Sequence, residues 1–439
     1  MSSRPLLWKG YEGMRKLLLT NIGMLATPQG KAAKKGAEQG QIQILKDAWV
    51  LVKDGVIDSV GTGAAPAAPG AEVIDAQGNL VTPGLVDAHT HLIFGGWRQN
   101  ELGMKLHGKT YLEIQNAGGG IQSTTNATRK ATEQELAEKA TKALNEMMGF
   151  GVTTVEAKSG YGLATDHELK ALQVIKDLND HHPMDVVATF MGAHLVPAEY
   201  KSNRAEYIRL VCEEMMPKVK EQGIAKFCDV FCEADTFSVE ESRQVLEAGL
   251  KYGLRPKIHA DEIEAIGGSV LAGEIGAISA EHLIVCPPEG IASMAKGGTI
   301  ACLLPATSFN LGSTFAPARD MVNAGVAVAM ATDFNPGSCP CLNLQFVINK
   351  YDINLSMGNL RQLQGVWSLH AKLEFFELLR FLMISKGSWV ALETCSAESP
   401  IASNRCAVSV LASCLPSTLP SSILPGKVAE KVLWLHAST

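Results

Sequence analysis

Residues 80–91 are the most informative stretch of the sequence, because an apolar run ends there directly before two histidines. The stretch is Leu80-Val81-Thr82-Pro83-Gly84-Leu85-Val86-Asp87-Ala88-His89-Thr90-His91. Side chains two positions apart in a β-strand point to the same face. His89 and His91 therefore converge at the end of a strand, as the imidazole ligands of a metal ion must. The pair alone is a weak signal, so the argument depends on further ligands elsewhere in the chain.

Composition narrows the class of protein. The chain has 439 residues and a net charge of -6, so it lacks the basic footprint of a nucleic-acid-binding protein. The sequence contains no uncharged apolar run of about 20 residues, so no transmembrane helix is predicted. The stretch Leu17-Leu18-Leu19 has too little apolar sequence around it for a signal peptide. We expect a small-molecule substrate and neither a nucleic-acid nor a membrane partner.

The cysteines indicate a reducing environment. The ten are scattered along the chain, and none forms a Cys-x2-Cys pair of the kind that binds zinc. Cys339-Pro340-Cys341 is one residue too short for that pattern. Unpatterned cysteines in a long chain are typical of reduced proteins, so a cytoplasmic location is expected.

Two fold patterns follow one another along the chain. Residues 48–52 and 56–60 are apolar and flank Asp54-Gly55, which predicts a β-hairpin within a small β domain at 14–80. From residue 81, short apolar strands alternate with amphipathic helices. The strands are expected at 85–88, 152–156, 186–190, 229–232, 256–259, 278–280, 300–304 and 327–331, and the helices include Glu133–Met148, Glu168–Leu178, Glu206–Gln222 and Val239–Tyr252. Eight such strands predict an α/β protein with a (β/α)8 TIM-like barrel over residues 81–380.

The ends of these strands carry the candidate site, because barrel enzymes place their active sites at the C-terminal ends of the strands. Five of the eleven histidines lie there, namely His89, His91, His194, His259 and His282. Carboxylates also follow strands, at Glu233, Glu262 and Asp333. His107, His181 and His182 lie in helices or connections and are expected at the surface.

His89, His91, His259 and Asp333 are the predicted metal ligands. Three imidazoles and one carboxylate suit Zn2+, and Fe2+ is also suitable. A bound divalent cation activates water at neutral pH, which predicts metal-assisted hydrolysis.

Three further roles follow for this hydrolysis. Asp333 can accept the proton of the water, and Glu262 can pass a proton to the leaving nitrogen. His282 can orient the water or polarise the carbonyl group. Glu262, His282 and Asp333 are therefore the predicted catalytic residues.

The motifs along the chain resemble those of the imidazolonepropionases, a family of the amidohydrolase superfamily. The resemblance covers about residues 15–349 and rests on residues 83–91, Ala117-Gly118-Gly119-Gly120-Ile121, Lys158-Ser159-Gly160-Tyr161-Gly162-Leu163, Gly192-Ala193-His194, His259-Ala260-Asp261-Glu262 and Asp333-Phe334-Asn335-Pro336-Gly337-Ser338. It implies hydrolysis of 4-imidazolone-5-propanoate to N-formimidoyl-L-glutamate, one Zn2+ or Fe2+/Fe3+ per subunit, and a homodimer. It also implies substrate or product contacts from Arg98, Tyr161, His194, Glu262, Asn335, Gly337 and Ser338.

Two residues near the site carry competing interpretations. Glu233 occupies the end of the fourth strand, where two-metal relatives place a bridging ligand, but the resemblance favours one metal. Lys158 is interpreted as the partner of a salt bridge or of loop backbone.

The sequence departs from the family pattern after residue 349. Residues 350–420 lack the apolar periodicity of helices that would cover the barrel, and Pro425-Gly426-Lys427 again resembles the family. A compensated pair of reading-frame shifts is our hypothesis for this pattern. Residues 381–439 are left unassigned, except that 423–439 would complete the small β domain.

Two alternative functions remain open at this point. One is another amidohydrolase that acts on a different cyclic amide or amino-heterocycle, whose ring would not require Arg98. The other is an inactive metal-binding remnant, because of the aberrant C-terminal region.

Overall fold

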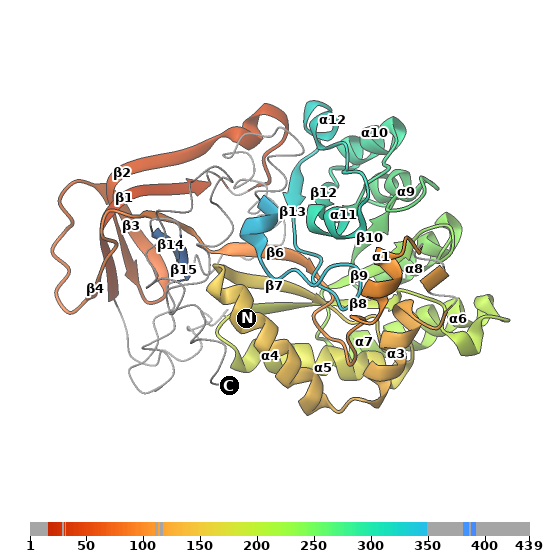
Figure 1. Cartoon of the computed structure of the whole chain (residues 1–439). Coiled ribbons are helices and arrows are strands. Elements are labelled where there is room, and N and C mark those ends of the chain that lie inside the picture. The colour runs from red at the N-terminus through yellow and green to blue at the C-terminus, as the bar shows by residue number, and fades with distance from the viewer. Residues whose placement is uncertain are drawn as a thin grey trace, which may run out of the picture.

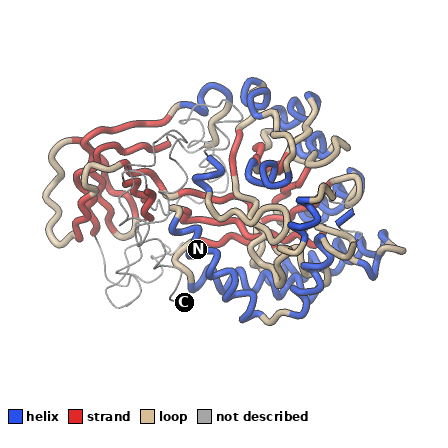
Figure 2. The backbone as a smooth tube through the Cα atoms, in the orientation of Figure 1, coloured by secondary structure: helices blue, strands red, loops and turns tan. Residues whose placement is uncertain are grey.

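A computed structural model describes residues 16–28, 30, 32–109, 113–114, 117–348, 381–385 and 388–391. Figure 1 shows two parts, a small β-sheet and a larger ring of strands that is surrounded by helices. Figure 2 makes the same division by secondary structure, because helices cover only the larger part. No helix among the described residues is both long enough and apolar enough to cross a membrane.

The larger part is the predicted (β/α)8 barrel. Its strands are parallel and follow one another in chain order from β6 to β13. They are β6 (Leu85–Thr90), β7 (Val152–Lys158), β8 (Asp185–Ala193), β9 (Phe227–Cys232), β10 (Arg255–Ala260), β11 (Ser279–His282), β12 (Ile300–Leu303) and β13 (Val328–Met330). Each strand expected from the sequence is present, so the predicted fold class is confirmed.

Backbone pairing after β13 closes the ring. Thr90 and Phe334 form a parallel bridge, the His91 N–H donates to the Phe334 carbonyl at 2.8 Å, and the Asp333 N–H donates to the His89 carbonyl at 3.0 Å. Below this bridge the buried carboxylate of Asp87 accepts the Thr332 N–H at 2.9 Å and the Thr332 hydroxyl at 2.6 Å. Closure therefore brings residues of the first strand against residues that follow the last.

Helices cover the outside of the ring (Figure 2). They include α1 (Glu101–Leu106), α3 (Gly120–Lys130), α4 (Glu133–Gly149), α5 (Thr165–His181), α6 (Arg204–Arg209), η3 (Leu210–Met215), α7 (Met216–Gln222), α8 (Val239–Lys251), α9 (Gly268–Glu274), α10 (Pro288–Gly297), α11 (Pro305–Leu311) and α12 (Ala318–Asn323), with a short η2 (Ala198–Tyr200). α4 and α8 begin in capping boxes, Thr132 with Glu135 and Ser238 with Glu241. The predicted helix 206–222 is interrupted by the π-helical turn η3. Pro217 lies just after this turn and has no backbone N–H to donate to the helix.

The small sheet begins with β1 (Lys16–Pro28), β2 (Ile42–Lys53), β3 (Val56–Thr62), β4 (Glu72–Asp75) and β5 (Leu80–Pro83). The predicted hairpin is confirmed, since β2 and β3 pair in antiparallel fashion around Asp54-Gly55. β1 pairs antiparallel with β2 and parallel with β4 and β5. β5 runs through Gly84 into β6, so the chain passes directly from the sheet into the barrel.

Two strands from the C-terminal region extend this sheet, and sequence analysis missed them. β14 (Phe381–Ser385) pairs antiparallel with β5, and β15 (Ser388–Ala391) pairs antiparallel with β14. The sheet thus combines segments from both sides of the barrel. The segment 423–439, predicted to complete it, lies outside the described residues, as does most of 350–420.

A turn between β1 and β2 reaches the N-terminal end of the barrel. The short helix η1 (Gly36–Gly40) carries Gln39, whose buried side-chain amide donates to the Val328 carbonyl and accepts the Val328 N–H at 3.2 Å. Nearby, Ala33 packs against an apolar cluster that includes Phe227, Ile300 and Ala329. This end of the barrel is therefore sealed by apolar side chains and by Gln39.

Replacing Gln39 by Ala should destabilise the protein without affecting the opposite end of the barrel. The substitution leaves two backbone groups of Val328 unpaired and buried, so we expect the free energy of unfolding to fall by about 1–3 kcal/mol. Chemical denaturation measures this. Gln43→Ala on β2, where the side chain is exposed, is the matched control. Equal stability of the two variants would contradict the role of Gln39.

Candidate metal centre and active site

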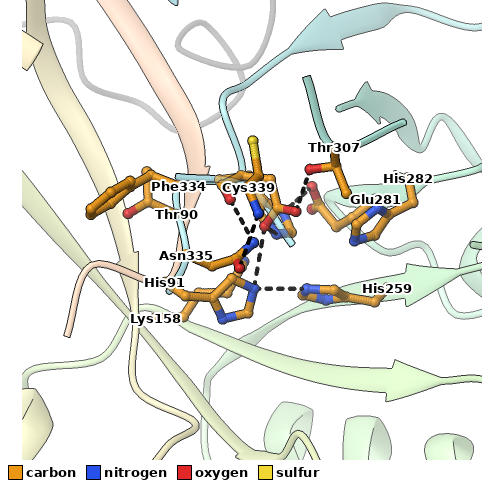
Figure 3. A network of polar contacts seen from close by, with 12 residues as sticks. Thr90, His91, Lys158, His259, Glu281, His282, Thr307, Phe334, Asn335 and Cys339 are labelled. Atoms are coloured by element: carbon orange, nitrogen blue, oxygen red, sulfur yellow. Dashed lines mark hydrogen bonds and ion pairs between the residues drawn. The ribbon is translucent and has the colours of Figure 1, made fainter. Parts of the chain in front are cut away.

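Barrel closure gathers the four predicted metal ligands. His89 and His91 lie at the end of β6, His259 lies on β10, and Asp333 follows β13. Asp333 Oδ1 is 3.4 Å from His89 Nε2 and 3.6 Å from His91 Nε2. His91 Nε2 is in turn 3.3 Å from His259 Nε2, and Figure 3 shows these two imidazoles facing one another.

The donor atoms of this set fit a metal ion. His89 Nε2 and Asp333 Oδ1 are buried and have no hydrogen-bond partner within the described residues. Leaving such atoms unpaired is expensive, so an additional binding partner is implied. Metal–ligand bonds of about 2.0–2.2 Å in a tetrahedral arrangement separate neighbouring donors by roughly 3.4 Å, close to the distances here. The structure therefore contains a buried, histidine-rich metal-binding group.

His282, predicted to orient the water or polarise the carbonyl group, lies directly beside the metal-binding histidines. Ligand atoms of His89, His259 and His282 lie within 4.8 Å of one another. Its Nδ1 is buried without a partner in the described structure, and its Nε2 lies 3.6 Å from Glu262 Oε2. His282 (φ 67°) and Asp333 (φ 55°) both adopt the left-handed backbone region, a strain that non-glycine residues often carry at functional sites.

Burial keeps the histidines in the form that binds metal. It lowers the pKa of His89, His91 and His282 well below the ordinary value, and proximity to Lys158 and to one another lowers it further. Neutral imidazole is the metal-binding form, so the site needs no deprotonation of these residues near pH 7.

Buried groups behind the ligands fix their orientation. Glu281 Oε2 is 2.8 Å from His89 Nδ1, and Asp229 Oδ1 is 3.0 Å from His259 Nδ1. The Thr307 hydroxyl donates to Asp333 Oδ2 at 2.6 Å. A carboxylate on Nδ1 leaves Nε2 free to bind a metal. None of these three residues was predicted from the sequence, although the charged Asp229 inside an apolar strand was an available signal.

A cavity of about 940 Å³ opens above the metal-binding group. All seven residues expected to contact substrate or product line it, together with apolar side chains: Arg98, Tyr161, His194, Glu262, Asn335, Gly337 and Ser338, with Trp97, Phe231 and Ile284. The cavity therefore brings together three of the predicted metal ligands, His91, His259 and Asp333, and the predicted substrate contacts.

Arg98 is a buried cationic group in the wall of this cavity. It is only 5% exposed, and its Nε and Nη1 have no hydrogen-bond partner in the described structure, although Glu101 Oε2 lies 3.5 Å from Nε. A Cβ on Gly337 would lie 1.5 Å from Arg98 Nη2, so only glycine leaves room for the guanidinium there. Glu101 also accepts the Gly120 N–H at 2.7 Å, which ties Arg98 to the glycine-rich motif at 118–120.

His194 and Tyr161 form another wall of the cavity. The His194 ring stacks on His91 with centroids 4.8 Å apart, and its Nδ1–H donates to the Gly160 carbonyl at 2.9 Å. Burial, with the neighbouring His259, lowers the pKa of His194 to about 3, so its Nε2 is left as an acceptor. The buried carboxylate of Glu168 accepts backbone N–H groups of residues 160, 162 and 163 and so fixes the loop that carries Tyr161.

Asn335 organises its own loop. Its Oδ1 accepts the N–H groups of Gly337, Ser338 and Cys339, and its Nδ2 donates to the Asp333 carbonyl and to Ser338 Oγ. The side-chain amide is therefore used within the loop that carries Asp333, as Figure 3 shows beside the ligands.

The contacts of Glu233 and Lys158 bear on their competing interpretations. Glu233 accepts the N–H groups of Ala234, Ile263 and Glu264, so both of its oxygens hold the loop beside Glu262. Both oxygens therefore already have hydrogen-bond partners in the loop, and the binding of one metal rather than two stays a prediction. Lys158 forms the predicted salt bridges, with Glu156 and Asp229.

One histidine outside the site was predicted wrongly. His182 is buried, and its Nε2 is 3.2 Å from Asn145 Oδ1, whereas His107 and His181 are exposed as expected. The error arises because contact with α4 is a tertiary feature that a connection between predicted elements does not reveal.

Residues 80–371 match the model of the amidohydrolase family. The chain is 50% identical over 341 residues to an imidazolonepropionase of Alkaliphilus metalliredigens (strain QYMF), an alignment that covers 76% of this chain and 81% of that protein. It is 48% identical over 361 residues to an imidazolonepropionase of Geobacillus sp. (strain WCH70), with coverages of 80% and 85%.

Solved structures share the fold at low sequence identity. A guanine deaminase from C. acetobutylicum with bound guanine aligns with a TM-score of 0.58 and 18% identity, over 84% of this chain and 91% of that one. The E. coli guanine deaminase aligns with a TM-score of 0.62 and 14% identity, over 84% and 88%. These likenesses bear on the architecture alone.

His259→Ala should lower the metal content of the purified protein well below that of the wild type. The substitution removes one donor of the set and leaves Asp229 without its imidazole partner. Elemental analysis after gel filtration measures the content. His181→Ala, which removes an exposed histidine from the end of α5, is the control and should retain metal. Undiminished metal in His259→Ala would show that His259 is not a ligand.

Proposed function

Because the chain belongs to the amidohydrolase family and, within it, to the imidazolonepropionases, we infer that it hydrolyses 4-imidazolone-5-propanoate to N-formimidoyl-L-glutamate. The observation that carries the inference is the combination of two features in one cavity. Histidines and Asp333 form its floor, and Arg98 supplies a cation for the propionate of the substrate.

The reaction opens the ring at the amide bond. Water adds its oxygen to the carbonyl carbon, the bond from that carbon to the ring nitrogen breaks, and the nitrogen takes up a proton. The carbonyl carbon becomes a carboxylate of the glutamate product, and the released nitrogen becomes the end of the formimidoyl group. The protein must therefore bind the propionate, accept one proton from water and deliver one to nitrogen.

We propose that His89, His91, His259 and Asp333 hold one zinc or iron ion. Such an ion lowers the pKa of a water molecule that it binds to about 7 and polarises carbonyl groups. Asp333 is proposed to accept the proton of the attacking water, because its Oδ1 lies among the imidazoles where that water would be held, while Thr307 bonds to Oδ2. Burial raises the pKa of Asp333 to about 6.

Glu262 is proposed to deliver the proton to the leaving nitrogen. It lines the cavity, and burial, together with Asp333 and Glu233, raises its pKa to about 8. The carboxyl group therefore carries a proton at pH 7. His282, 3.6 Å away, is proposed to orient the attacking water or the carbonyl group.

Around the ring, His194 and Tyr161 are proposed to position the substrate. The Nε2 of His194 is an acceptor suited to a ring N–H, because its Nδ1 hydrogen is donated to Gly160. Gly337 and Ser338 are proposed to contact the product side, with Asn335 acting through the loop that it organises.

We further propose a cytoplasmic location, which is supported by the free state of the seven cysteines in the described part of the chain. The homodimer implied by the family resemblance remains a prediction, and sedimentation analysis would test it. Turnover of imidazolonepropionate by metal-analysed protein tests the function itself. Metal-loaded protein without turnover would favour the inactive remnant, and turnover of only another cyclic amide would favour a different amidohydrolase.

Glu262→Gln should retain metal and lose activity by roughly 10²–10⁴-fold, the usual contribution of a general acid or base. In the wild type, kcat/KM should fall as the pH rises through about 8, because the raised pKa of Glu262 keeps its proton in place only below that pH. Steady-state kinetics across pH test both points. The same alkaline fall in the glutamine variant would assign the titration to another group.

Arg98→Met should lower kcat/KM for imidazolonepropionate about 10- to 150-fold, mainly through KM, because a charge-assisted hydrogen bond contributes about 1.5–3 kcal/mol. Gly337→Ala should act in the same direction, since it displaces the guanidinium without removing it. An imidazolone without the propionate group should respond little to either change. Equal losses with both substrates would make Arg98 a structural residue.

A further inference from the structure

Two buried lysines lie beneath the metal-binding group and have no part in the proposed chemistry. Lys158 on β7 is 0% exposed and Lys257 on β10 is 1% exposed. A buried ammonium group persists only where carboxylates compensate its charge, so the partners of these lysines carry the argument.

The two lysines make matched chains of contacts to two of the histidines. Lys257 Nζ is 2.9 Å from Glu281 Oε1, and the other oxygen of Glu281 meets His89 Nδ1. Lys158 Nζ is 2.7 Å from Asp229 Oδ2, and the other oxygen of Asp229 meets His259 Nδ1. In each chain one carboxylate oxygen faces a lysine and the other faces an imidazole.

Lys158 has a second carboxylate partner, Glu156, which is hydrogen-bonded to the peptide that carries His89 and His91. Its Nζ is 2.8 Å from Glu156 Oε1. Glu156 Oε2 accepts the Thr90 N–H at 3.3 Å, and the Thr90 hydroxyl donates to the Glu156 carbonyl at 2.7 Å. Thr90 is the residue between His89 and His91. Lys158 therefore joins the end of β6, through Glu156, to His259, through Asp229.

The charge of Lys158 is held firmly. Burial alone would lower the pKa of Lys158, but the carboxylates of Asp229, Glu156 and Glu281 raise it above its ordinary value. The ammonium group consequently stays charged at neutral pH. Figure 3 shows Lys158 below His91, on the side opposite Thr307.

We propose that Lys158 is a positioning residue for the metal centre, which sets the imidazole of His259 and the His89-Thr90-His91 peptide at their mutual distance by bridging Asp229 and Glu156. The proposal rests on the metal centre proposed above. Without the ammonium group, Asp229 and Glu156 would repel one another, and the two halves of the ligand set would lose their common anchor. The lysine acts through these carboxylates and touches neither metal nor substrate.

Zinc affinity of Lys158→Met tests the proposal, because a lysine that only stabilised the core would change stability and leave affinity alone. Competition with a chromogenic chelator should give a Kd for zinc that is about 10- to 100-fold weaker than in the wild type, the usual effect of losing a residue behind the ligands. The rise in Tm that zinc produces should shrink accordingly.

Lys170→Met is the matched control. Lys170 donates to the carbonyls of Thr128, Arg129 and Ala131, at the end of α3 and away from the ligands. We expect this variant to lower the Tm of the zinc-free and zinc-loaded protein equally and to keep the wild-type Kd.

A second variant covers the case in which Lys158→Met does not fold. Glu156→Gln combined with Lys158→Met removes one charge of each sign and should still show weakened zinc binding. Zinc affinity within about twofold of the wild type in the folded variant would overturn the role of Lys158. Failure of the wild type itself to bind zinc or iron would instead overturn the metal centre and this proposal with it.

Discussion

The backbone pairing of β6 with residues 332–334 closes the barrel and, with the same hydrogen bonds, brings together three of the four predicted metal ligands. The Asp333 N–H bonds to the His89 carbonyl, and the Phe334 carbonyl accepts from His91. The carboxylate and two imidazoles are therefore neighbours because the ring is closed. Asp87 adds two bonds to Thr332 just below. We call this pairing between β6 and residues 332–334 the seam. A change that opened the seam would separate Asp333 from both histidines, so the site can form only when the barrel is closed.

Polarity inside the barrel is layered along the strands. On β9, Phe227 belongs to the apolar end and Asp229 to the charged layer. On β10, Lys257 lies two residues before His259 and therefore on the same face. The charged layer separates the apolar seal from the ligands, and its carboxylates meet the Nδ1 atoms of His89 and His259. Burial of so many ionisable groups is tolerable because lysines and carboxylates are paired.

Local patterns explain what the sequence could predict. Short apolar strands at a regular spacing predicted the barrel, and the rule that active sites lie at strand ends found His194, His259 and Asp333 without any knowledge of contacts. Asp229 and Lys257 were missed because their partners lie on other strands, and a sequence does not state which strands face one another across a ring. β14 was missed for a related reason, since its pairing with β5 joins segments from opposite sides of the barrel. Gly337 was assigned from resemblance, whereas its reason, the space taken by Arg98, is visible only in three dimensions.

The seam also sets an order of events during synthesis. Asp87 and Thr332, which bond to one another across it, are 245 residues apart in the chain. A ribosome that adds roughly 5–20 residues per second needs on the order of 10–50 s to cover that distance. During this time the histidines of β6 have emerged while their carboxylate partner does not yet exist. A nascent chain can therefore offer only an incomplete set of ligands, and full metal capture belongs to the last stage of translation or to the released protein.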